Sequence, residues 1–211
     1  MNSVFSVLLF FVFLSGTAFS AEALPDLSSE AKIISFPIAD SSPKTLGGLR
    51  KDQNEIAITV DDGPTPSTTP KILKIFRDYK IKATFFLVGE NAKKYPEMVK
   101  AILREGHSIA NHTWSHPQMT ALSSAEAASE IDRSAQVLNE IVEDMQRHGE
   151  TENAVVQPFF RFPYGDGASD EKLIQLLRER GLANFYWRMS AHDSRTQDPA
   201  VALKTSIEML S

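Results

Sequence analysis

The sequence predicts an α/β fold in which helices cover a parallel sheet, either open or closed as a barrel. Short apolar runs rich in β-branched and aromatic residues, such as 56–60 and 83–88, are typical of buried strands. Between these runs, apolar residues recur at helical spacing and are bounded by capping residues and glycines. Because the two patterns alternate, we expect about five strand–helix units joined by crossover connections.

The first two units occupy the first half of the chain. We expect a strand at 56–60 and a helix through 72–76, where apolar residues follow the helical period. A second strand is expected at 83–88. The helix after it runs from about Tyr95 to Glu105, and Gly106 ends it.

The third unit and the fourth strand follow. Residues 107–111 are expected to form a strand, with His107 as a hydrogen-bonded structural residue at its start. Ser123 and Glu126 have the spacing of a capping box, which opens the longest predicted helix. A fourth strand is predicted at 159–162.

The remaining elements complete the prediction. A helix from Asp170 to Arg180 stops at Gly181, and a fifth strand is expected around 183–189. Asp198 and Pro199 then open a last helix as its N-cap and first-turn proline. In folds of this kind, chemistry gathers at the carboxyl ends of the strands.

Composition and charge exclude some partners. The chain has 211 residues and a formal net charge of −5, without a block of Lys and Arg. This argues against nucleic acid, whose phosphates need a concentrated positive surface, and leaves a neutral or weakly charged polymer as a partner. The sequence contains no cysteine, so disulfides contribute nothing to the fold.

The N-terminal residues differ from the rest. Residues 1–20 combine a short apolar run with small residues near Ala18, which predicts a signal peptide and a secreted, periplasmic or cell-wall location. The alternatives are an uncleaved anchor and a buried segment. After cleavage we expect no stable membrane span. Residues 21–53, with prolines and a glycine pair, are predicted to be an extended lead-in to a domain at 54–211.

Two clusters of polar residues directly follow predicted strands. Asp61 and Asp62 come after the first strand, where paired carboxylates are costly without a positive neighbour, although many such turns are only solvated surface. His112 and His116 come after the third strand and can converge on one ion where the chain curves. With Asp62 they would form a site with open positions for water; the alternative is a surface loop with unrelated histidines.

A third cluster follows the fourth strand. Arg161 at a strand end can hold a carboxylate in a fixed, ionised geometry. The Pro163-Tyr164-Gly165 turn can aim a backbone N–H into the site. The alternative is a plain turn with one surface arginine.

Together, the three clusters resemble a known family. Thr-Val-Asp-Asp-Gly (59–63), His-Thr-Trp-Ser-His (112–116) and Arg-Phe-Pro-Tyr-Gly (161–165) are similar, in this order, to the first three motifs of the polysaccharide deacetylases with a NodB-type domain, carbohydrate esterase family 4. The resemblance covers about residues 55–193. It implies a distorted (β/α) barrel that removes acetyl groups from N-acetylated polysaccharides.

The resemblance also implies roles for the residues in these motifs. One divalent ion, Zn²⁺ or else Co²⁺ or a similar ion, would be bound by Asp62, His112 and His116. Metal-bound water would attack the acetamide, with Asp61 as the general base and Arg161 as the partner that orients that base.

Two further residues receive roles at the edge of the site. The backbone N–H of Tyr164 would stabilise the oxyanion together with the metal. Trp114 has two possible roles, lining a sugar groove or packing within its loop.

The fourth motif of the family is only partly kept. Its Trp–Asp–Asp–Trp pattern aligns with Trp187, Ser190, Asp193 and Ser194. Asp193 therefore matches the carboxylate that supports the arginine, while the two serines replace an aspartate and a tryptophan. This affects the expected wall of the substrate site.

The family's final Leu-x-His motif, which would supply a general acid, is absent from the sequence. We therefore expect a NodB-type domain at 54–211 that is truncated after about five strand–helix units; the alternative is a complete protein that has lost this acid. The expected substrate is a peptidoglycan or chitin-like chain. Removal of O-acetyl groups and metal-retaining sugar binding without catalysis are the competing functions.

Overall fold

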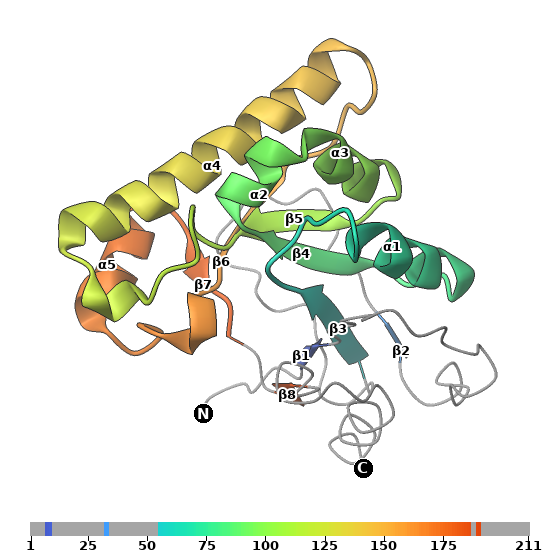
Figure 1. Ribbon diagram of the computed structural model, residues 1–211. Helices are drawn as coiled ribbons and strands as arrows, with labels where there is room; N and C mark the ends of the chain where they lie inside the picture. Colours follow the sequence, from blue (N-terminus) through green and yellow to red (C-terminus); the bar gives the residue numbers. More distant parts are fainter. Residues whose placement is uncertain (1–6, 10–31, 34–54, 187–188, 191–211) are drawn as a thin grey trace.

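Five parallel strands form the centre of the fold. The computed structural model describes residues 7–9, 32–33, 55–186 and 189–190. The central strands are β3 (Glu55–Val60), β4 (Ala83–Leu87), β5 (Ser108–Asn111), β6 (Val156–Phe160) and β7 (Ala183–Asn184). They lie in the order β7-β6-β5-β4-β3 and curl into a half-barrel, which confirms the predicted α/β class (Figure 1).

Three short strands extend the sheet beyond β3. β1 (Val7–Leu9) pairs in parallel with β3 and with β8 (Met189–Ser190). β2 (Lys32–Ile33) pairs with the start of β3. β1 comes from the segment expected to be a signal peptide, and β2 from the expected lead-in.

Apart from α2 (Gly89–Lys94), the helices follow the strands as the sequence predicts. The other helices are α1 (Thr69–Asp78), α3 (Pro96–Arg104), α4 (Ser124–Arg147) and α5 (Glu171–Glu179), and Figure 1 shows α4 crossing above α2 and β5. Two short 3₁₀ turns, Met119–Ala121 and Pro163–Gly165, lie in the connections. Among the described residues, no helix is both long enough and apolar enough to span a membrane.

The capping box at the start of α4 is confirmed. The side chain of Ser123 accepts a hydrogen bond from the Glu126 N–H, and the Glu126 carboxylate accepts one from the Ser123 N–H at 2.8 Å. Both groups satisfy backbone donors that the first turn leaves without helical partners. This fixes where α4 begins and therefore how it lies over β5.

Three elements of the structure differ from the sequence prediction. The polar segment before Tyr95 forms α2, which the sequence pattern had not indicated. The fourth strand occupies Val156–Phe160 instead of 159–162, because the chain pairs with β5 in an irregular register around the exposed Pro158. The expected strand at 183–189 is replaced by β7 and β8, which lie at different places in the sheet. The helix expected from Asp198 lies outside the described residues.

Both faces of the central sheet are apolar. Phe85 and Leu87 on β4 pack with Ile109 into the layer below the helices. Phe86 points to the opposite face and packs with Ala110, Phe159 and Phe185. Burial on both faces explains why β4 has an unbroken apolar sequence, as is typical of parallel strands. The polar residues after these strands are left together at the carboxyl ends.

Candidate metal centre

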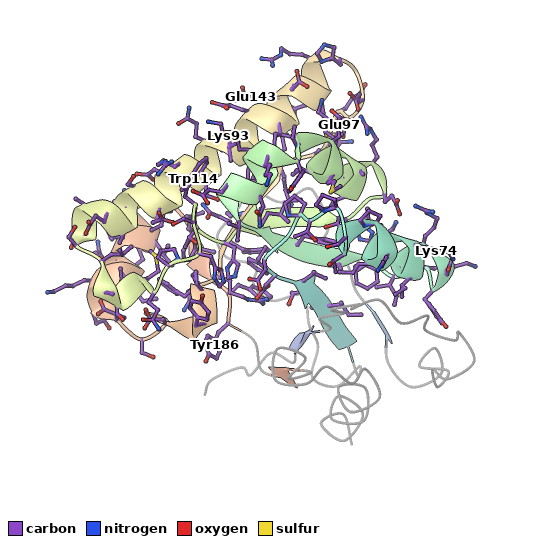
Figure 2. The ribbon with its side chains drawn as sticks, in the orientation of Figure 1. Lys74, Lys93, Glu97, Trp114, Glu143 and Tyr186 are labelled. Carbon is purple, nitrogen blue, oxygen red and sulfur yellow. The ribbon has the colours of Figure 1, made fainter. Side chains whose placement is uncertain are left out.

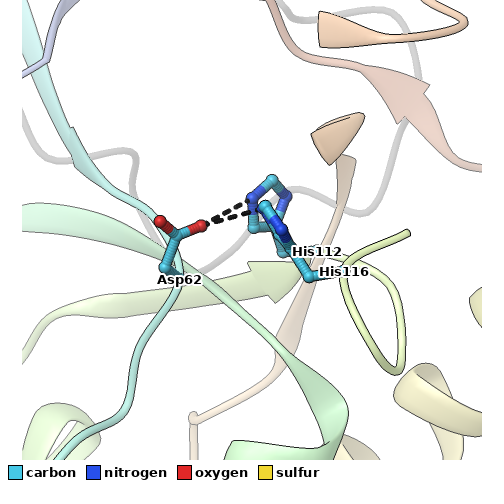
Figure 3. Close-up of side chains that lie close together, drawn as sticks. All are labelled: Asp62, His112 and His116. Carbon is cyan, nitrogen blue, oxygen red and sulfur yellow. Dashed lines mark ion pairs between the residues drawn. The ribbon is translucent and has the colours of Figure 1, made fainter. Parts of the chain in front are cut away.

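Asp62 lies just beyond the end of β3 in an unusual backbone conformation. Its φ is 69°, in the left-handed region that residues other than glycine rarely adopt. The side-chain amide of Asn91, from α2, donates a hydrogen bond to the Asp62 carbonyl at 2.9 Å. The surrounding structure thus holds Asp62 in a conformation that turns its carboxylate toward the end of β5 (Figure 3).

His112 follows β5 and is almost completely buried. Its Nδ1 lies 2.8 Å from the carbonyl oxygen of Arg161. Since a carbonyl can only accept, Nδ1 donates the proton in this contact, and Nε2 is the ring nitrogen left to face Asp62. A fixed ring with one free nitrogen is the arrangement in which proteins present histidine to a metal.

His116 is brought back to His112 by a tight loop. The φ angles of Thr113 and His116 are 67° and 61°, and the Thr113 hydroxyl accepts a hydrogen bond from the His116 N–H at 3.0 Å. The two imidazole centroids lie 4.9 Å apart, edge to face. The predicted convergence of the two histidines is therefore present.

The three predicted ligands form one group. Asp62 Oδ1 lies 3.3 Å from His112 Nε2 and 3.1 Å from His116 Nε2 (Figure 3). One ligand atom from each residue lies within 4.8 Å of the others. Two imidazole nitrogens and one carboxylate oxygen suit a divalent ion such as Zn²⁺, and three protein ligands leave a position for water or substrate. The residues present therefore fit a metal of this kind.

The charge state of Asp62 suits the same purpose. Burial raises the pKa of Asp62, but hydrogen bonds and charge interactions with His112 and His116 outweigh burial and bring the pKa well below its usual value. The group is thus a carboxylate at neutral pH, which is the form that binds a cation.

Asp61 faces a different partner from its neighbour. It is 8% exposed, and its Oδ1 accepts a hydrogen bond from Arg161 Nη1 at 2.6 Å. Arg161 is fully buried, so this is a charged pair removed from water. Burial lowers the pKa of Arg161, and the charge and hydrogen bond of Asp61 offset this lowering only in part. The adjacent aspartates therefore lie in separate environments, Asp62 with histidines and Asp61 with arginine.

Arg161 is held from several strands. Nη1 also donates to the Thr59 hydroxyl at 2.8 Å, and Nε donates to the Phe185 carbonyl at 3.0 Å. The guanidinium carbon lies 4.1 Å from the centroid of the Phe86 ring. These contacts give Arg161 one orientation.

Tyr164 and Trp114 lie in different surroundings. Tyr164 is 66% exposed, and its ring meets the His116 ring edge to face, with centroids 4.6 Å apart. Trp114 points away toward the helices, where its ring contacts Arg133 and lies near Lys93 (Figure 2). A Cβ added to Gly89 would come within 2.8 Å of this ring. These contacts correspond to the packing role of Trp114.

Some residues of the site were not predicted. Thr59 could have been found, because it precedes Asp61 by two residues and so shares a strand face with it. Asn91 belongs to α2, which the sequence pattern does not indicate. Glu130 belongs to α4 and accepts hydrogen bonds from the Trp114 and Ser115 N–H groups, a contact that the helix pattern does not indicate. Asp193, predicted to support Arg161, lies outside the described residues.

The fold and site define a class: an α/β half-barrel with an Asp–His–His group at the carboxyl ends of its strands. The family model for polysaccharide deacetylases matches residues 48–185. This is more than half of the sequence, and the chain therefore belongs to the polysaccharide deacetylase family.

Individual relatives agree with this assignment. The chain is 41% identical over 112 residues to a peptidoglycan-N-acetylglucosamine deacetylase of Bacillus cereus, covering 53% of this chain and 37% of the relative. It is 32% identical over 146 residues to a chitooligosaccharide deacetylase of Azorhizobium caulinodans, covering 69% and 63%. The chain therefore spans less than two thirds of the length of either relative.

A solved structure extends the likeness to the fold. The peptidoglycan deacetylase PdaC from Bacillus subtilis superposes with a TM-score of 0.62 at 29% identity, covering 72% of this chain and 67% of that structure. The shared part contains the curled sheet whose strand ends carry the candidate site.

Proposed function

We propose that this protein removes acetyl groups from an N-acetylated polysaccharide by metal-dependent hydrolysis. The observation that carries the proposal is the convergence of Asp62, His112 and His116 beside a buried, arginine-paired Asp61. This arrangement separates metal ligands from a carboxylate that is free for proton transfer. The motif order and the family membership support the same reaction.

Zn²⁺ is the ion that we propose for the site, because two imidazoles and one carboxylate form a typical catalytic zinc ligand set. A divalent ion bound there lowers the pKa of water and polarises an acetyl carbonyl. Asp62, His112 and His116 would hold it, and the hydrogen bond from His112 Nδ1 to the Arg161 carbonyl fixes which imidazole nitrogen is offered.

Asp61 is the proposed general base. Its carboxylate takes a proton from water while the water oxygen bonds to the carbonyl carbon of the acetamide. Collapse of the tetrahedral species breaks the C–N bond, releases acetate and leaves the sugar amine, which takes the proton that Asp61 had accepted. Arg161 holds the Asp61 carboxylate in one orientation through the contact at 2.6 Å.

Two supporting roles belong to the same proposal. The backbone N–H of Tyr164, in the turn next to His116, would donate to the oxygen on which negative charge develops. Asp193 would support Arg161. Both roles come from the motif resemblance.

The proposed substrate is a chain containing N-acetylglucosamine. The relatives from Bacillus cereus and Azorhizobium caulinodans are a peptidoglycan and a chitooligosaccharide deacetylase by name, and N-acetylglucosamine occurs in both kinds of chain. The same residues could also hydrolyse an O-acetyl ester, since the carbonyl carbon and its oxygen are presented in the same way.

Acetate release from N-acetylglucosamine oligomers, measured with and without added Zn²⁺, tests the proposal. We expect release that depends on the metal and stops with a chelator. Release only from an O-acetylated polysaccharide would identify an esterase. Sugar binding without release from either substrate would identify a non-catalytic domain.

The metal site has its own test. We expect the purified wild type to hold about one divalent ion per chain and the His112→Ala and His116→Ala variants to lose it, because two remaining ligands bind weakly. Metal analysis of the three proteins measures this directly. Equal metal content in all three would end the proposal for the site.

We also propose that residues 1–20 act as a signal peptide and that the protein works outside the cytoplasm. The support is the short apolar run followed by small residues. Expression in a bacterium with its own export machinery should yield protein that begins near Ala21, as mass spectrometry of its N-terminal peptide would show. Exported protein that retains the Val7–Leu9 strand would contradict the proposal.

A further inference from the structure

Glu130, on α4, contacts the loop that carries His116. Its Oε2 accepts hydrogen bonds from the backbone N–H of Trp114 at 3.0 Å and of Ser115 at 2.8 Å. Its Oε1 accepts a third from the Ser115 hydroxyl at 3.0 Å. Both carboxylate oxygens thus bond to the loop that carries His116.

The loop needs such support because of its backbone. Thr113 and His116 both have positive φ, which is unfavourable for side chains with a Cβ. An unfavourable conformation persists only where surrounding contacts impose it. In this loop, the two positive φ angles reverse the direction of the chain, and His116 therefore lies beside His112 and Asp62.

The contacts that impose this conformation come from two helices. From α2, the N–H groups of Gly89 and Glu90 donate to the carbonyls of Thr113 and Trp114, each at 2.9 Å. From α4, Glu130 accepts the next two N–H groups on the other side of the loop. The loop backbone is held from both directions at its middle, between the two ligands.

We propose that Glu130 is a positioning residue for the metal site: it fixes the loop of residues 113–116 and thereby sets where His116 presents Nε2. This inference rests on the proposed metal site. Its basis is geometric, because one carboxylate oxygen bridges two successive N–H groups. The length of the Glu130 side chain therefore decides whether this oxygen reaches both N–H groups.

Three substitutions of Glu130 separate geometry from charge. Glu130→Gln keeps the length, its Oε1 can accept both N–H groups, and its amide can donate to the Ser115 hydroxyl. Glu130→Asp keeps the charge but is one methylene too short. Glu130→Ala removes the contact. We expect Zn²⁺ affinity, measured by chelator competition, to fall about 10- to 100-fold for Asp and Ala, the usual effect of losing a residue that orients a ligand. The Gln variant should stay within about threefold of the wild type.

Amide hydrogen exchange in the metal-free protein provides a readout that does not depend on the metal site. Exchange at the Trp114 and Ser115 amides should accelerate about tenfold or more in the Glu130→Asp and Glu130→Ala variants and little in the Glu130→Gln variant. Amides of β4 and β5 should stay protected in all three. Glu143→Ala, an exposed position on the same helix, is the matched control and should change neither readout (Figure 2).

The outcomes are distinct. Unchanged exchange at these amides in the Glu130→Asp and Glu130→Ala variants overturns the inference. Faster exchange with unchanged Zn²⁺ affinity also overturns it, because the loop would then not set the position of His116. An intact Asp variant with an impaired Gln variant would show that charge matters instead. If the wild type binds no metal, the proposed site fails, and exchange alone still shows whether Glu130 holds the loop.

Discussion

At the scale of single residues, the site depends on giving two adjacent aspartates different partners. Asp62 lies against His112 and His116, whereas Asp61 is buried against Arg161. In a regular strand, neighbouring side chains point to opposite faces of the sheet. The left-handed conformation of Asp62 departs from this pattern, so both carboxylates can belong to one site and still have different partners. One carboxylate can therefore bind the ion while the other remains available to a proton.

This division of roles makes a prediction for Asp61. Asp61→Asn should keep its metal, since Asp61 is not among the three ligands, but lose about 100- to 10,000-fold in kcat, the usual value of a general base. Acetate release and metal content should be measured on the same preparations, with Asp62→Asn as the control that loses metal. Near-normal turnover of the Asp61 variant would mean that the two roles are reversed.

At the scale of elements, β4 and β5 are joined by a buried histidine. His107, just before β5, accepts a hydrogen bond at Nδ1 from the Ala83 N–H at 3.2 Å, and its ring packs on Phe76 and Phe85. It is a structural residue, as predicted, but its partner lies in the neighbouring strand and not nearby in sequence. Because Nδ1 accepts this bond, the ring is neutral in the folded protein.

That contact predicts how stability depends on pH. Burial lowers the pKa of His107 to about 4, and Lys82 adds to the effect while Glu105 opposes it. His107 binds a proton near pH 6.5 in the unfolded chain but only near pH 4 in the folded protein. The stability that comes from keeping His107 neutral is therefore complete above pH 6.5 and is lost as the pH falls to 4. For a pKa shift of this size, the free energy of unfolding changes by about 3 kcal/mol in total.

Urea unfolding between pH 4 and 7 measures the effect. In the His107→Asn variant, where the amide oxygen can still accept from Ala83, the free energy of unfolding should fall less steeply with acid than in the wild type. Both proteins should be metal-free, so that the metal-site histidines contribute equally. Parallel curves for the two proteins would rule out His107 as the source.

The elements also show what a sequence can predict. The runs that form β3 and β4 are buried on both faces, and their pattern alone indicates buried strands. Gln157 and Pro158 interrupt the apolar pattern of β6, so the sequence predicts a strand that starts only at 159; the pairing with β5 makes these two residues part of the strand. The candidate ligands are predictable because histidine is rare in this sequence and because Asp62, His112 and His116 all follow predicted strands. Glu130 is not, because a glutamate on a helix surface looks the same whether or not a loop lies against it.

At the scale of the whole molecule, Arg161 connects separate parts of the half-barrel. It bonds Asp61 and Thr59 at the end of β3 and the carbonyl of Phe185 beyond β7, and it lies over Phe86 of β4. The curl of the sheet brings these distant strand ends together around one buried charge. Arg161 is therefore part of the fold as well as part of the site.

Arg161→Met should accordingly destabilise the entire domain. Methionine fills much of the volume but leaves Asp61 buried without a counter-charge, which typically costs about 3–5 kcal/mol. In an Asp61→Asn background the same substitution should cost clearly less, because no unpaired charge remains. Urea unfolding of the wild type, both single variants and the double variant at neutral pH, without metal, gives the coupling between the two side chains. Additive losses would mean that Arg161 stabilises the fold mainly through Phe185 and the aromatic packing, and that its pairing with Asp61 serves the site alone.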